Sequence, residues 1–361
     1  MSLKSPILIM AGGTGGHIFP ALAVAHALQE KGYPVSWLGT KAGMEAKILA
    51  RHPDIPIDFI QIQNLRGKGL KRHLRLPFHL FKAILQARKI IQKRQVKLII
   101  GFGGYVSGPG ALAAKSLAIP FIIHEQNAIP GLTNRILSRW AAQVLTGFPH
   151  VFPQLKKAFH TGNPIRNDLL SLHRKADPAH SPLQLLIIGG SLGAEIFNQI
   201  IPEAIALIPE SNRPEVWHQC GDKNGEDTTL RYQTQHVSAK VTPFINDMNA
   251  AYTWADLIIC RAGALTVSEL AIIGKPALFV PLPYAADNHQ YYNAKAPTDH
   301  GASILIPQAE FSAEKIATLL QKYIQNPNIL SSMAEKMREL GQPTATELVI
   351  EQCMKYLNKK Q

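Results

Sequence analysis

Three glycine-rich segments of this 361-residue chain each follow a short apolar run, at 12–17, 101–110 and 189–193. Glycine lets a backbone approach a ligand closely, and the first turn of a following helix offers unbonded amides to an anion. Turns between strands and helices also use glycine for geometry alone. The three segments are therefore compatible with phosphate binding and leave the kind of phosphate open.

The same segments argue against two common classes of phosphate-binding protein. None matches G-x-G-x-x-G in register at the start of either half of the chain, and the second apolar run ends in Leu38-Gly39-Thr40, without an acid for a ribose. This disfavours a nicotinamide dehydrogenase. The sequence G-x-x-x-x-G-K-[ST] does not occur, which excludes the phosphate-loop NTPases.

Residues 255–274 are the most informative part of the chain. They predict a strand over 257–260, a turn of small residues at 262–264 and a helix ended by Gly274. The small residues leave the helix N-terminus open for a diphosphate. Glu269 falls in the first turns of this helix, where its carboxylate can bridge two vicinal hydroxyls of a ribose. Ser268 and Glu269 are equally typical of ordinary capping positions.

Short β-branched apolar runs alternate with helix-length segments, which indicates buried parallel sheets built from βαβ units. Residues 4–16 also resemble residues 181–193, so each half opens with a strand, a glycine-rich turn and a helix. We predict an α/β fold of two Rossmann-like, doubly wound parallel-sheet domains facing a cleft, over 1–162 and 163–342, with a C-terminal helix over about 343–358 packing on the first domain. The predicted strands are 7–10, 35–38, 59–62, 98–100, 121–124, 144–146, 185–188, 216–219, 241–244, 257–260, 277–280 and 303–306.

The positive charge of the chain is concentrated in its first half. Residues 1–160 hold 21 Lys and Arg against 5 Asp and Glu, a net charge of +16, while the remaining residues carry −3 of the overall +13. No acidic residue occurs from Phe59 to His124. This asymmetry predicts a polyanionic partner, either nucleic acid or an anionic membrane, although a basic run can also be a solvated face.

Residues 66–94 contain two apolar stripes at helical spacing. Phe78, Phe81 and Leu85 share one face, bordered by lysines that include Lys82. If one stripe packs on a sheet, the other is exposed, and an exposed apolar stripe bordered by cations suits an anionic bilayer interface. The basic run lacks interleaved aromatic residues and a nucleic-acid-binding motif, so a membrane is favoured over nucleic acid. The second stripe consists of Leu80, Ile84, Ala87 and Ile91.

The cysteines and the lengths of the apolar runs indicate in which cellular compartment the protein is expected. The three cysteines, Cys220, Cys260 and Cys353, are too scattered for a disulfide framework or a metal site, which fits a reducing environment. No apolar run approaches the ~18 residues of a membrane-spanning helix. The apolar run near the N-terminus is too short for a signal peptide, so we expect the protein to stay inside the cell.

Six motifs together give the chain a resemblance to a known family. They are G-T-G-G-H-I-F-P-A at 13–21, L-R-G-K-G at 65–69, G-G-Y-V-S-G-P at 103–109, H-E-Q-N at 124–127, G-N-P-I-R at 162–166 and A-L-T-V-S-E at 264–269. In this order they closely resemble the MurG family of UDP-N-acetylglucosamine (UDP-GlcNAc) transferases, within glycosyltransferase family 28. The resemblance covers nearly the whole chain.

The resemblance implies the GT-B fold and an inverting transfer of GlcNAc to the C4 hydroxyl of MurNAc in undecaprenyl-pyrophosphoryl-MurNAc-pentapeptide. This is the conversion of lipid I to lipid II in peptidoglycan synthesis. It further implies a peripheral protein at the cytoplasmic face of the bacterial plasma membrane, with other cell-wall synthesis proteins as possible partners and no nucleic acid. Another GT-B enzyme, such as a nucleotide-sugar epimerase or a soluble glycosyltransferase, is the alternative.

The resemblance also implies which residues bind the two substrates. One departure from the family concerns the sugar contacts: the run at 286–291 differs from the usual Asp-Arg-Gln-Gln-Tyr, and His289 replaces an expected Gln. The implied UDP-GlcNAc site consists of Thr14, Gly15, Gly16, Asn127, Arg166, Ser191, Ile245, Ala264, Leu265, Thr266, Val267, Ser268, Glu269 and Gln290. The implied acceptor and membrane contacts are Lys68, Lys71, Arg72, Leu74, Arg75, Phe78, Phe81, Lys82, Leu85, Tyr105 and Asn134.

Inverting transfer needs a group that takes the acceptor proton and a positive potential that receives the leaving diphosphate. We favour His17 as the base, because it follows the first glycine-rich turn and an imidazole with a pKa near ~6.5 suits proton transfer at neutral pH. His17 could instead donate to a phosphate, and Glu125 is the alternative base. No Asp-x-Asp occurs, so we expect no required active-site metal, with stimulation by a divalent cation left open.

Overall fold

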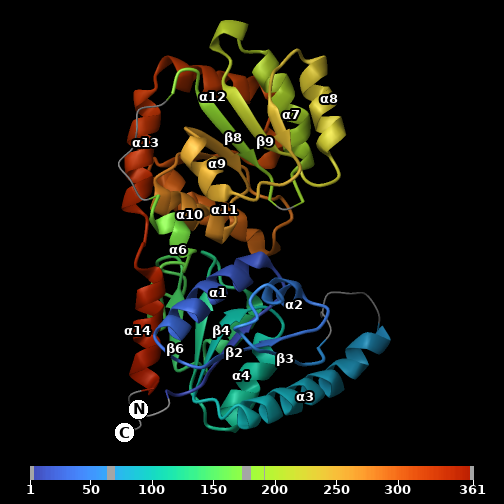
Figure 1. The fold of residues 1–361 in the computed structure, drawn as a ribbon, viewed down its shortest axis with the longest axis vertical. Coiled ribbons are helices and arrows are strands. Elements are labelled where there is room, and N and C mark those ends of the chain that lie inside the picture. The colour runs from blue at the N-terminus through green and yellow to red at the C-terminus, as the bar shows by residue number, and fades with distance from the viewer. Residues whose placement is uncertain (1–3, 63–69, 173–179, 191, 358–361) are drawn as a thin grey trace. The chain divides into compact units, whose positions relative to one another are not determined.

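The computed structural model describes residues 4–62, 70–172, 180–190 and 192–357, with residues 70–76 described as backbone alone. The chain divides into two compact units, whose elements are labelled in Figure 1. The first unit comprises Met1–Arg166 and Pro343–Gln361, and the second comprises Asn167–Gln342.

The first unit extends to Arg166 and does not end at the predicted residue 162. Asn163 is 2% exposed, and its Nδ2 donates to the backbone oxygen of Gln126 at 3.0 Å. A Cβ added to Gly147 would lie 2.1 Å from Asn163 Oδ1, so the backbone at Gly147 packs directly against this side chain. These contacts tie residues 163–166 to the first unit, and their predicted assignment to the second domain is wrong.

The first unit is built on a seven-stranded sheet in which every pair of neighbouring strands is parallel. The strand order is β3-β2-β1-β4-β5-β6-β7. The strands are β1 (Ile7–Ala11), β2 (Val35–Gly39), β3 (Ile57–Phe59), β4 (Leu98–Gly103), β5 (Phe121–Glu125), β6 (Gln143–Thr146) and β7 (Ala158–His160). The helices are α1 (Gly15–Glu30), α2 (Met44–Leu49), α3 (Leu70–Lys93), α4 (Ser107–Ser116), α5 (Leu132–Leu137) and α14 (Ala345–Leu357).

The second unit has a six-stranded parallel sheet in the order β10-β9-β8-β11-β12-β13. Its strands are β8 (Gln184–Ile188), β9 (Glu215–Gln219), β10 (Lys240–Thr242), β11 (Leu257–Cys260), β12 (Ala277–Phe279) and β13 (Ser303–Leu305). Its α-helices are α6 (Asn167–Leu170), α7 (Glu195–Ala206), α8 (Gly225–Thr234), α9 (Met248–Trp254), α10 (Ala264–Ile273), α11 (His289–Asp299), α12 (Ala313–Gln325) and α13 (Asn328–Glu339). Short 3-10 helices span Glu210–Asn212, Ala286–Asn288 and Gln308–Glu310.

Two strands of the first unit differ from the sequence prediction. The strand predicted over 59–62 spans Ile57–Phe59, and β7 was not predicted. Both are three-residue strands at opposite edges of the sheet, and neither contains a buried residue. An edge strand that is exposed on one side lacks the continuous apolar run by which buried strands are recognised.

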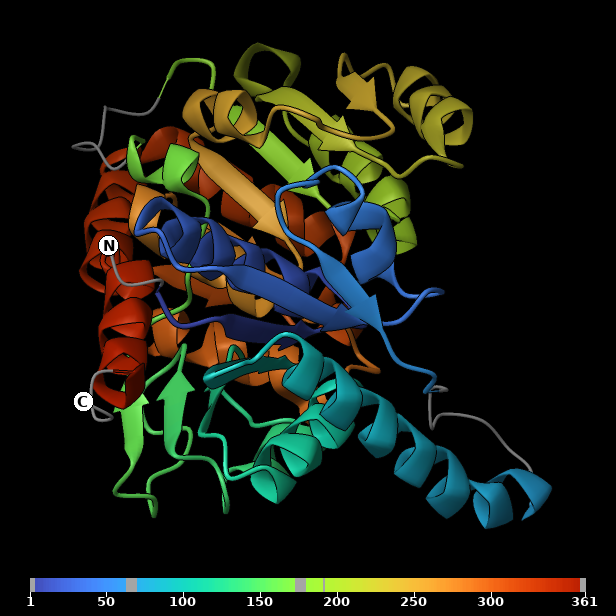
Figure 2. The ribbon, with the colours of Figure 1, turned by 60° about the horizontal axis from the view of Figure 1, so that its bottom comes forward.

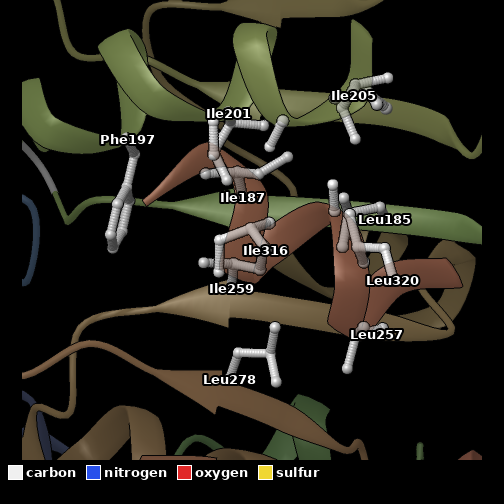
Figure 3. Packing of buried hydrophobic residues seen from close by; sticks show 14 of the residues in the cluster. Leu185, Ile187, Phe197, Ile201, Ile205, Leu257, Ile259, Leu278, Ile316 and Leu320 are labelled. Atoms are coloured by element: carbon white, nitrogen blue, oxygen red, sulfur yellow. The ribbon is translucent and has the colours of Figure 1, made fainter. Parts of the chain in front are cut away.

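The core of the second unit lies between its sheet and helices that include α7 and α12. Fully buried residues of β8, β11 and β12 meet apolar side chains of these helices, because strands covered on both faces must bury both sets of side chains. Figure 3 labels ten members of this cluster: Leu185, Ile187, Phe197, Ile201, Ile205, Leu257, Ile259, Leu278, Ile316 and Leu320.

The C-terminal helix α14 belongs to the first unit, where Figure 1 shows it beside α1. Val349, Ile350 and Cys353 are buried in the same cluster as the apolar face of α1. Near the end of the helix, Tyr356 Oη donates to the backbone oxygen of Ala142 at 2.9 Å. The chain thus returns to its first unit after completing the second.

Helix α3 exposes one of the two stripes predicted for it. Phe78, Phe81 and Leu85 are 68%, 59% and 44% exposed, whereas Ala87 and Ile91 are fully buried. Lys82 is exposed beside the apolar stripe. Figure 2 shows the first turns of α3 extending beyond the rest of the first unit. Within the described residues no helix is both long enough and apolar enough to cross a membrane.

A leucine-to-alanine pair tests the core of the second unit. Leu320 is fully buried on α12, whereas Leu230 on α8 is 60% exposed. We expect Leu320→Ala to lower the free energy of unfolding of this unit by about 2–5 kcal/mol, because the side chain leaves a cavity. Leu230→Ala should cost less than about 0.5 kcal/mol. Urea denaturation of the full chain measures both, and equal losses would contradict the packing.

Candidate active site

Two glycine-rich turns of the first unit lie where its strand order changes direction. Strand β1 pairs with β2 on one side and with β4 on the other, so the turns after β1 and β4 leave the carboxyl edge of the sheet as neighbours. A Cβ added to Gly104, whose φ is +81°, would lie 2.1 Å from the backbone oxygen of Gly12. Only glycine permits this approach, and doubly wound sheets bind ligands at such a switch point.

Helix α1 begins in the first of these turns without a side-chain cap. Thr14 is the N-cap residue, and its side chain makes no capping hydrogen bond. Thr14 and Gly16 are exposed, and Gly15 is partly exposed. Accessible amides at a helix start attract anions. Thr14, Gly15 and Gly16, which were predicted to face phosphates, therefore lie at an accessible helix start that can attract an anion.

The buried carboxylate of Glu45 holds the glycine-rich turn after β1 by hydrogen bonds. Glu45, in the first turn of α2, is fully buried, and its Oε1 accepts from the backbone amide and the hydroxyl of Thr40 at 2.9 and 2.8 Å. Its Oε2 accepts from the amide of Gly13 at 3.3 Å. A buried charge requires such donors. The sequence prediction missed Glu45, and the available signal was an acid shortly after a strand end in a half of the chain with few acids.

His17 presents its imidazole between the two turns. It lies in the first turn of α1 and is partly buried, with Nδ1 2.8 Å from Gln126 Oε1. The ring packs against Gly103, whose φ is +109°, and a Cβ there would lie 3.0 Å from both Cε1 and Nδ1 of His17. The predicted base is therefore held at the switch point of the first sheet.

Glu125, the alternative base, is enclosed by hydrogen-bond donors. It is 1% exposed, its Oε1 accepts from the amide and the Nδ2 of Asn127 at 3.0 and 3.2 Å, and its Oε2 accepts from the Gly131 amide at 3.1 Å and from Asn134 Nδ2 at 2.9 Å. Four donors thus fix the orientation of this carboxylate. Glu125 therefore holds the loop between β5 and α5, and its alternative role as the base stays a prediction.

Asn134, predicted on the acceptor side, supports Glu125. Its side chain is 2% exposed, so it does not form part of an exposed membrane-binding surface, and its role toward the acceptor stays a prediction. Asn127, predicted near the donor sugar, is partly exposed at the end of β5. Tyr105, predicted on the acceptor side, lies near the first turn, since a Cβ on Gly13 would be 3.6 Å from its Cε1.

The second unit repeats the switch-point arrangement. Strand β8 pairs with β9 and with β11, so the turns after β8 and β11 are neighbours at the carboxyl edge. A Cβ on Gly193, whose φ is +74°, would lie 2.0 Å from the backbone oxygen of Cys220. The glycine-rich turn thus packs directly on the end of β9. Ser191, predicted as a diphosphate ligand in this turn, lies outside the described residues.

Side-chain amides fix this second glycine-rich turn. Gln219 Nε2 donates to the backbone oxygen of Gly190 at 3.0 Å. Asn198 on α7 and Asn224 before α8 both donate to the backbone oxygen of Cys220, at 3.2 and 3.1 Å. These bonds hold the ends of β8 and β9 together, and the sequence prediction named none of the three amides.

The predicted strand, turn and helix after residue 256 are confirmed. Helix α10 starts after β11 with Gly263 as its N-cap and no side-chain cap, and it ends at Gly274 in the left-handed conformation with a φ of 70°. Ala264, Leu265 and Thr266 form the open helix start. Val267 donates its amide to the oxygen of Gly263 at 3.0 Å, and its side chain is 3% exposed. The contact of Val267 with the donor stays a prediction.

Glu269 and Ser268 lie in the second turn of α10, beyond the capping positions. Glu269 is partly exposed, and Tyr252 Oη donates to its Oε2 at 2.9 Å, which fixes the orientation of the carboxylate. The Ser268 hydroxyl donates to the backbone oxygen of Ala264 at 2.9 Å. The ordinary capping interpretation does not apply, because this helix begins at Ala264.

Two further predicted ligands lie beyond neighbouring strands of the same sheet. Ile245 follows β10 and has a side chain that is 4% exposed, which leaves its main chain for contacts. Gln290, in the first turn of α11, accepts from the Leu282 amide at 2.9 Å. Asn293 donates to the oxygen of Ala262 at 3.1 Å and so ties α11 to the turn before α10. His289 bonds within its own loop, with Nδ1 2.7 Å from the oxygen of Ala286.

The remaining predicted contacts are cationic or lie on α3. Arg166 is exposed as the last residue of the first unit. Lys68 lies outside the described residues, and for Lys71, Arg72, Leu74 and Arg75 only the backbone of α3 is described. In the described ranges, no three His, Cys, Asp or Glu residues are grouped as metal ligands.

A buried histidine in the second unit makes the free energy of unfolding of this unit depend on pH. His218 on β9 is fully buried with Nδ1 2.9 Å from Tyr232 Oη, and burial lowers the pKa of His218 to about 3. Below a pH of ~6.5 the unfolded chain binds a proton that the folded chain does not bind. The free energy of unfolding therefore falls as the pH falls from about 6.5 toward 3.

We expect His218→Gln to weaken this pH dependence. Between pH 7 and pH 5 the wild-type second unit should lose roughly 2 kcal/mol more than the variant, the equivalent of ~1.5 pKa units. Trp217 and Trp254 lie in this unit, so their fluorescence reports its urea denaturation. Equal losses in wild type and variant would show that His218 is not held neutral.

Comparisons with known proteins identify the family of this chain. The glycosyltransferase family 28 N-terminal domain matches residues 7–146, and the C-terminal domain of that family matches residues 184–349. A relative from Alkalilimnicola ehrlichii, named UDP-N-acetylglucosamine–N-acetylmuramyl-(pentapeptide) pyrophosphoryl-undecaprenol N-acetylglucosamine transferase, is 48% identical over 355 residues. The match covers 98% of this chain and 99% of the relative.

Solved structures support the same conclusion. The crystal structure of Acinetobacter baumannii MurG is 42% identical with a TM-score of 0.83, covering 98% of this chain and 100% of that one. A UDP-N-acetylglucosamine 2-epimerase structure reaches a TM-score of 0.68 over 99% of this chain and 98% of its own, but at 15% identity it shows a likeness of fold alone. With two Rossmann-like parallel-sheet units of the GT-B type, this chain belongs to glycosyltransferase family 28.

Proposed function

We propose that the protein transfers GlcNAc from UDP-GlcNAc, with inversion, to the C4 hydroxyl of MurNAc in undecaprenyl-pyrophosphoryl-MurNAc-pentapeptide. The product is lipid II of peptidoglycan synthesis. The observation that carries this proposal is the 48% identity, over 98% of the chain, to a relative named for that transfer. The likeness to an epimerase is one of fold alone and does not favour the alternative.

The second unit supplies the donor site in this proposal. The open start of α10 and the glycine-rich turn after β8 receive the diphosphate, because unbonded amides and the helix dipole stabilise its negative charge. Glu269, oriented by Tyr252, accepts hydrogen bonds from the ribose hydroxyls. Gln290 reads the hydroxyls of GlcNAc, and the main chain at Ile245 meets uracil.

The first unit supplies the acceptor side. As the C4 hydroxyl attacks the anomeric carbon, its proton passes to His17, the new glycosidic bond forms, and UDP leaves with the electrons of the broken bond. Thr14, Gly15 and Gly16 face phosphate oxygens at the start of α1. Positive potential from the helix starts and Arg166 stabilises the departing diphosphate, so the chemistry requires no active-site metal. Stimulation by a divalent cation remains compatible with this scheme.

We propose that the protein binds to the cytoplasmic face of the bacterial plasma membrane, and the exposed stripe of α3 supports this proposal. Phe78, Phe81 and Leu85 are exposed beside Lys82 in the strongly basic half of the chain. An apolar stripe with flanking cations binds at an anionic interface, and each lysine or arginine near the surface adds ~1 kcal/mol of attraction. Such docking brings the first unit to its lipid-linked acceptor, and other cell-wall synthesis proteins are further partners.

The direct experiment is to incubate the protein with labelled UDP-GlcNAc and a short-chain lipid I analogue. We expect the disaccharide product and release of UDP, and no product when the acceptor lacks the lipid pyrophosphate. Conversion of UDP-GlcNAc without an acceptor would indicate an epimerase. An absence of both reactions, together with an absence of uridine nucleotide binding, would overturn the proposal.

Replacing Glu269 tests the donor site. Glu269→Ala should weaken UDP-GlcNAc binding by about 10- to 100-fold, because charge-assisted hydrogen bonds contribute ~1.5–3 kcal/mol. Calorimetric titration measures the affinity. Glu335→Ala, which removes an exposed carboxylate from α13 of the same unit, is the matched control and should bind as wild type. An unchanged affinity in Glu269→Ala would remove the ribose assignment.

Replacing the exposed stripe of α3 tests membrane contact. The triple variant Phe78→Ser, Phe81→Ser, Leu85→Ser should bind vesicles containing phosphatidylglycerol at least about 10-fold more weakly, since each apolar side chain contributes ~1.5–3 kcal/mol on burial. Cosedimentation measures the binding. Leu207→Ser with Leu230→Ser removes comparably exposed leucines from the second unit and should leave it unchanged. Equal binding by the triple variant and wild type would exclude this surface.

A further inference from the structure

A row of hydrogen-bonded side chains lies behind His17 in the first unit. His17 Nδ1 is 2.8 Å from Gln126 Oε1, and Gln126 Nε2 is 3.0 Å from His124 Nδ1. At the far end, His124 Nε2 is 3.0 Å from the backbone oxygen of Gly162. The row therefore runs from the end of the first unit's last strand to the imidazole at its switch point.

The orientation of the Gln126 amide follows from its neighbours. Gln126 Nε2 is also 3.0 Å from the backbone oxygen of His124, and a carbonyl oxygen can only accept a hydrogen bond. The atom facing it is therefore the NH2 group of the amide, and the atom facing His17 is the carbonyl oxygen. Because Oε1 can only accept, His17 Nδ1 must carry the hydrogen of that bond.

His124 keeps this orientation from reversing. Its Nε2 donates to the oxygen of Gly162, so its Nδ1 lone pair accepts from Gln126. His124 is fully buried and stacks on Phe102 with ring centroids 5.4 Å apart. Burial lowers the pKa of His124 to about 4, so the ring stays neutral near pH 7 and its Nδ1 remains an acceptor.

The row is also fixed in place. Gln126 is 1% exposed, and Asn163 Nδ2 donates to its backbone oxygen at 3.0 Å. The His17 ring packs against the backbone of Gly103, where even a Cβ would lie 3.0 Å away. A rotation of the Gln126 amide or of the His17 ring would break these hydrogen bonds.

We infer that Gln126, oriented by His124, is a positioning residue that locks neutral His17 in the tautomer with hydrogen on Nδ1 and a lone pair on Nε2. The free histidine side chain favours the opposite tautomer, in which Nε2 carries the hydrogen and cannot accept a proton. The catalytic consequence rests on the proposed function: the lone pair takes the proton of the acceptor hydroxyl. Gln126 Oε1 then remains bonded to Nδ1–H of the imidazolium.

The tautomer can be measured without any substrate. In the full chain with 15N-labelled histidines, at a mildly alkaline pH, the resonances that disappear in His17→Gln identify this ring. We expect a protonated Nδ1 and an unprotonated Nε2 in wild type, and a shift toward protonated Nε2 in Gln126→Leu. Gln352→Leu, which makes the same change at a buried glutamine on α14 of the same unit, should leave the His17 resonances unchanged.

Gln126→Glu serves as the conservative rescue. As a carboxylic acid, its side chain can donate to His124 and keep its carbonyl oxygen opposite His17 Nδ1, so the Nδ1–H form should return. Circular dichroism and thermal melting identify variants that fail to fold. A wild-type ring protonated on Nε2, or a folded Gln126→Leu variant with the wild-type tautomer, would overturn the inference.

Kinetics connect the tautomer with catalysis. Gln126→Leu should lower kcat by about 10- to 1,000-fold, because a base in the wrong tautomer loses much of its contribution. KM for UDP-GlcNAc should stay within about twofold of wild type, since Gln126 makes no donor contact in this scheme. A shifted tautomer with unchanged kcat would refute the catalytic part. If the wild type transfers no sugar, the proposed function fails, while the spectroscopic result still decides the tautomer.

Discussion

The close packing of backbone on backbone at the carboxyl edges of the two sheets is the constraint on which both sites depend. Gly104 lies against Gly12 in the first unit, and Gly193 lies against Cys220 in the second. In each case a Cβ would overlap a backbone oxygen, so a larger residue would separate the turns. This packing brings the turns of two neighbouring strands together and leaves the starts of α1 and α10 open to anions.

Buried polar side chains hold these turns in position. Glu45 and Glu125 are acidic residues close to the candidate site. Both are buried and accept hydrogen bonds from loops at the carboxyl edge. Gln219 does the same for the second unit through the oxygen of Gly190. A buried charge or amide is stable only when its partners are fixed, so each of these residues makes the adjacent turn more rigid.

The two units present different functional groups, which suit them to different roles in the proposed reaction. The second unit presents an open helix start, a glycine-rich turn and the oriented carboxylate of Glu269, which suit a nucleotide diphosphate. The first unit presents His17 and the exposed apolar stripe of α3, which suit proton transfer and a lipid surface. Sequence identity over nearly the full length to a named transferase joins these features into one proposed reaction.

The sequence predicted the two parallel-sheet α/β units, because buried parallel strands and glycine-rich turns have local sequence patterns. It identified ten of the strands within one or two residues at their ends, the helix over 264–273 and the exposed stripe of α3. It failed at β3 and at β7, short edge strands without a buried residue. The periodicity of apolar residues indicates which residues are buried, and β3 and β7 contain no buried residue.

The sequence alone could name His17, Glu125 and Asn134 as polar residues near motifs, but it could not separate a group facing a substrate from a group facing the protein. Only the tertiary structure decided that Glu125 and Asn134 are enclosed, and that Gln126 orients His17. Residue type determines which hydrogen bonds are possible. Which of them form depends on donors brought together from distant parts of the chain, and that information exists only after folding.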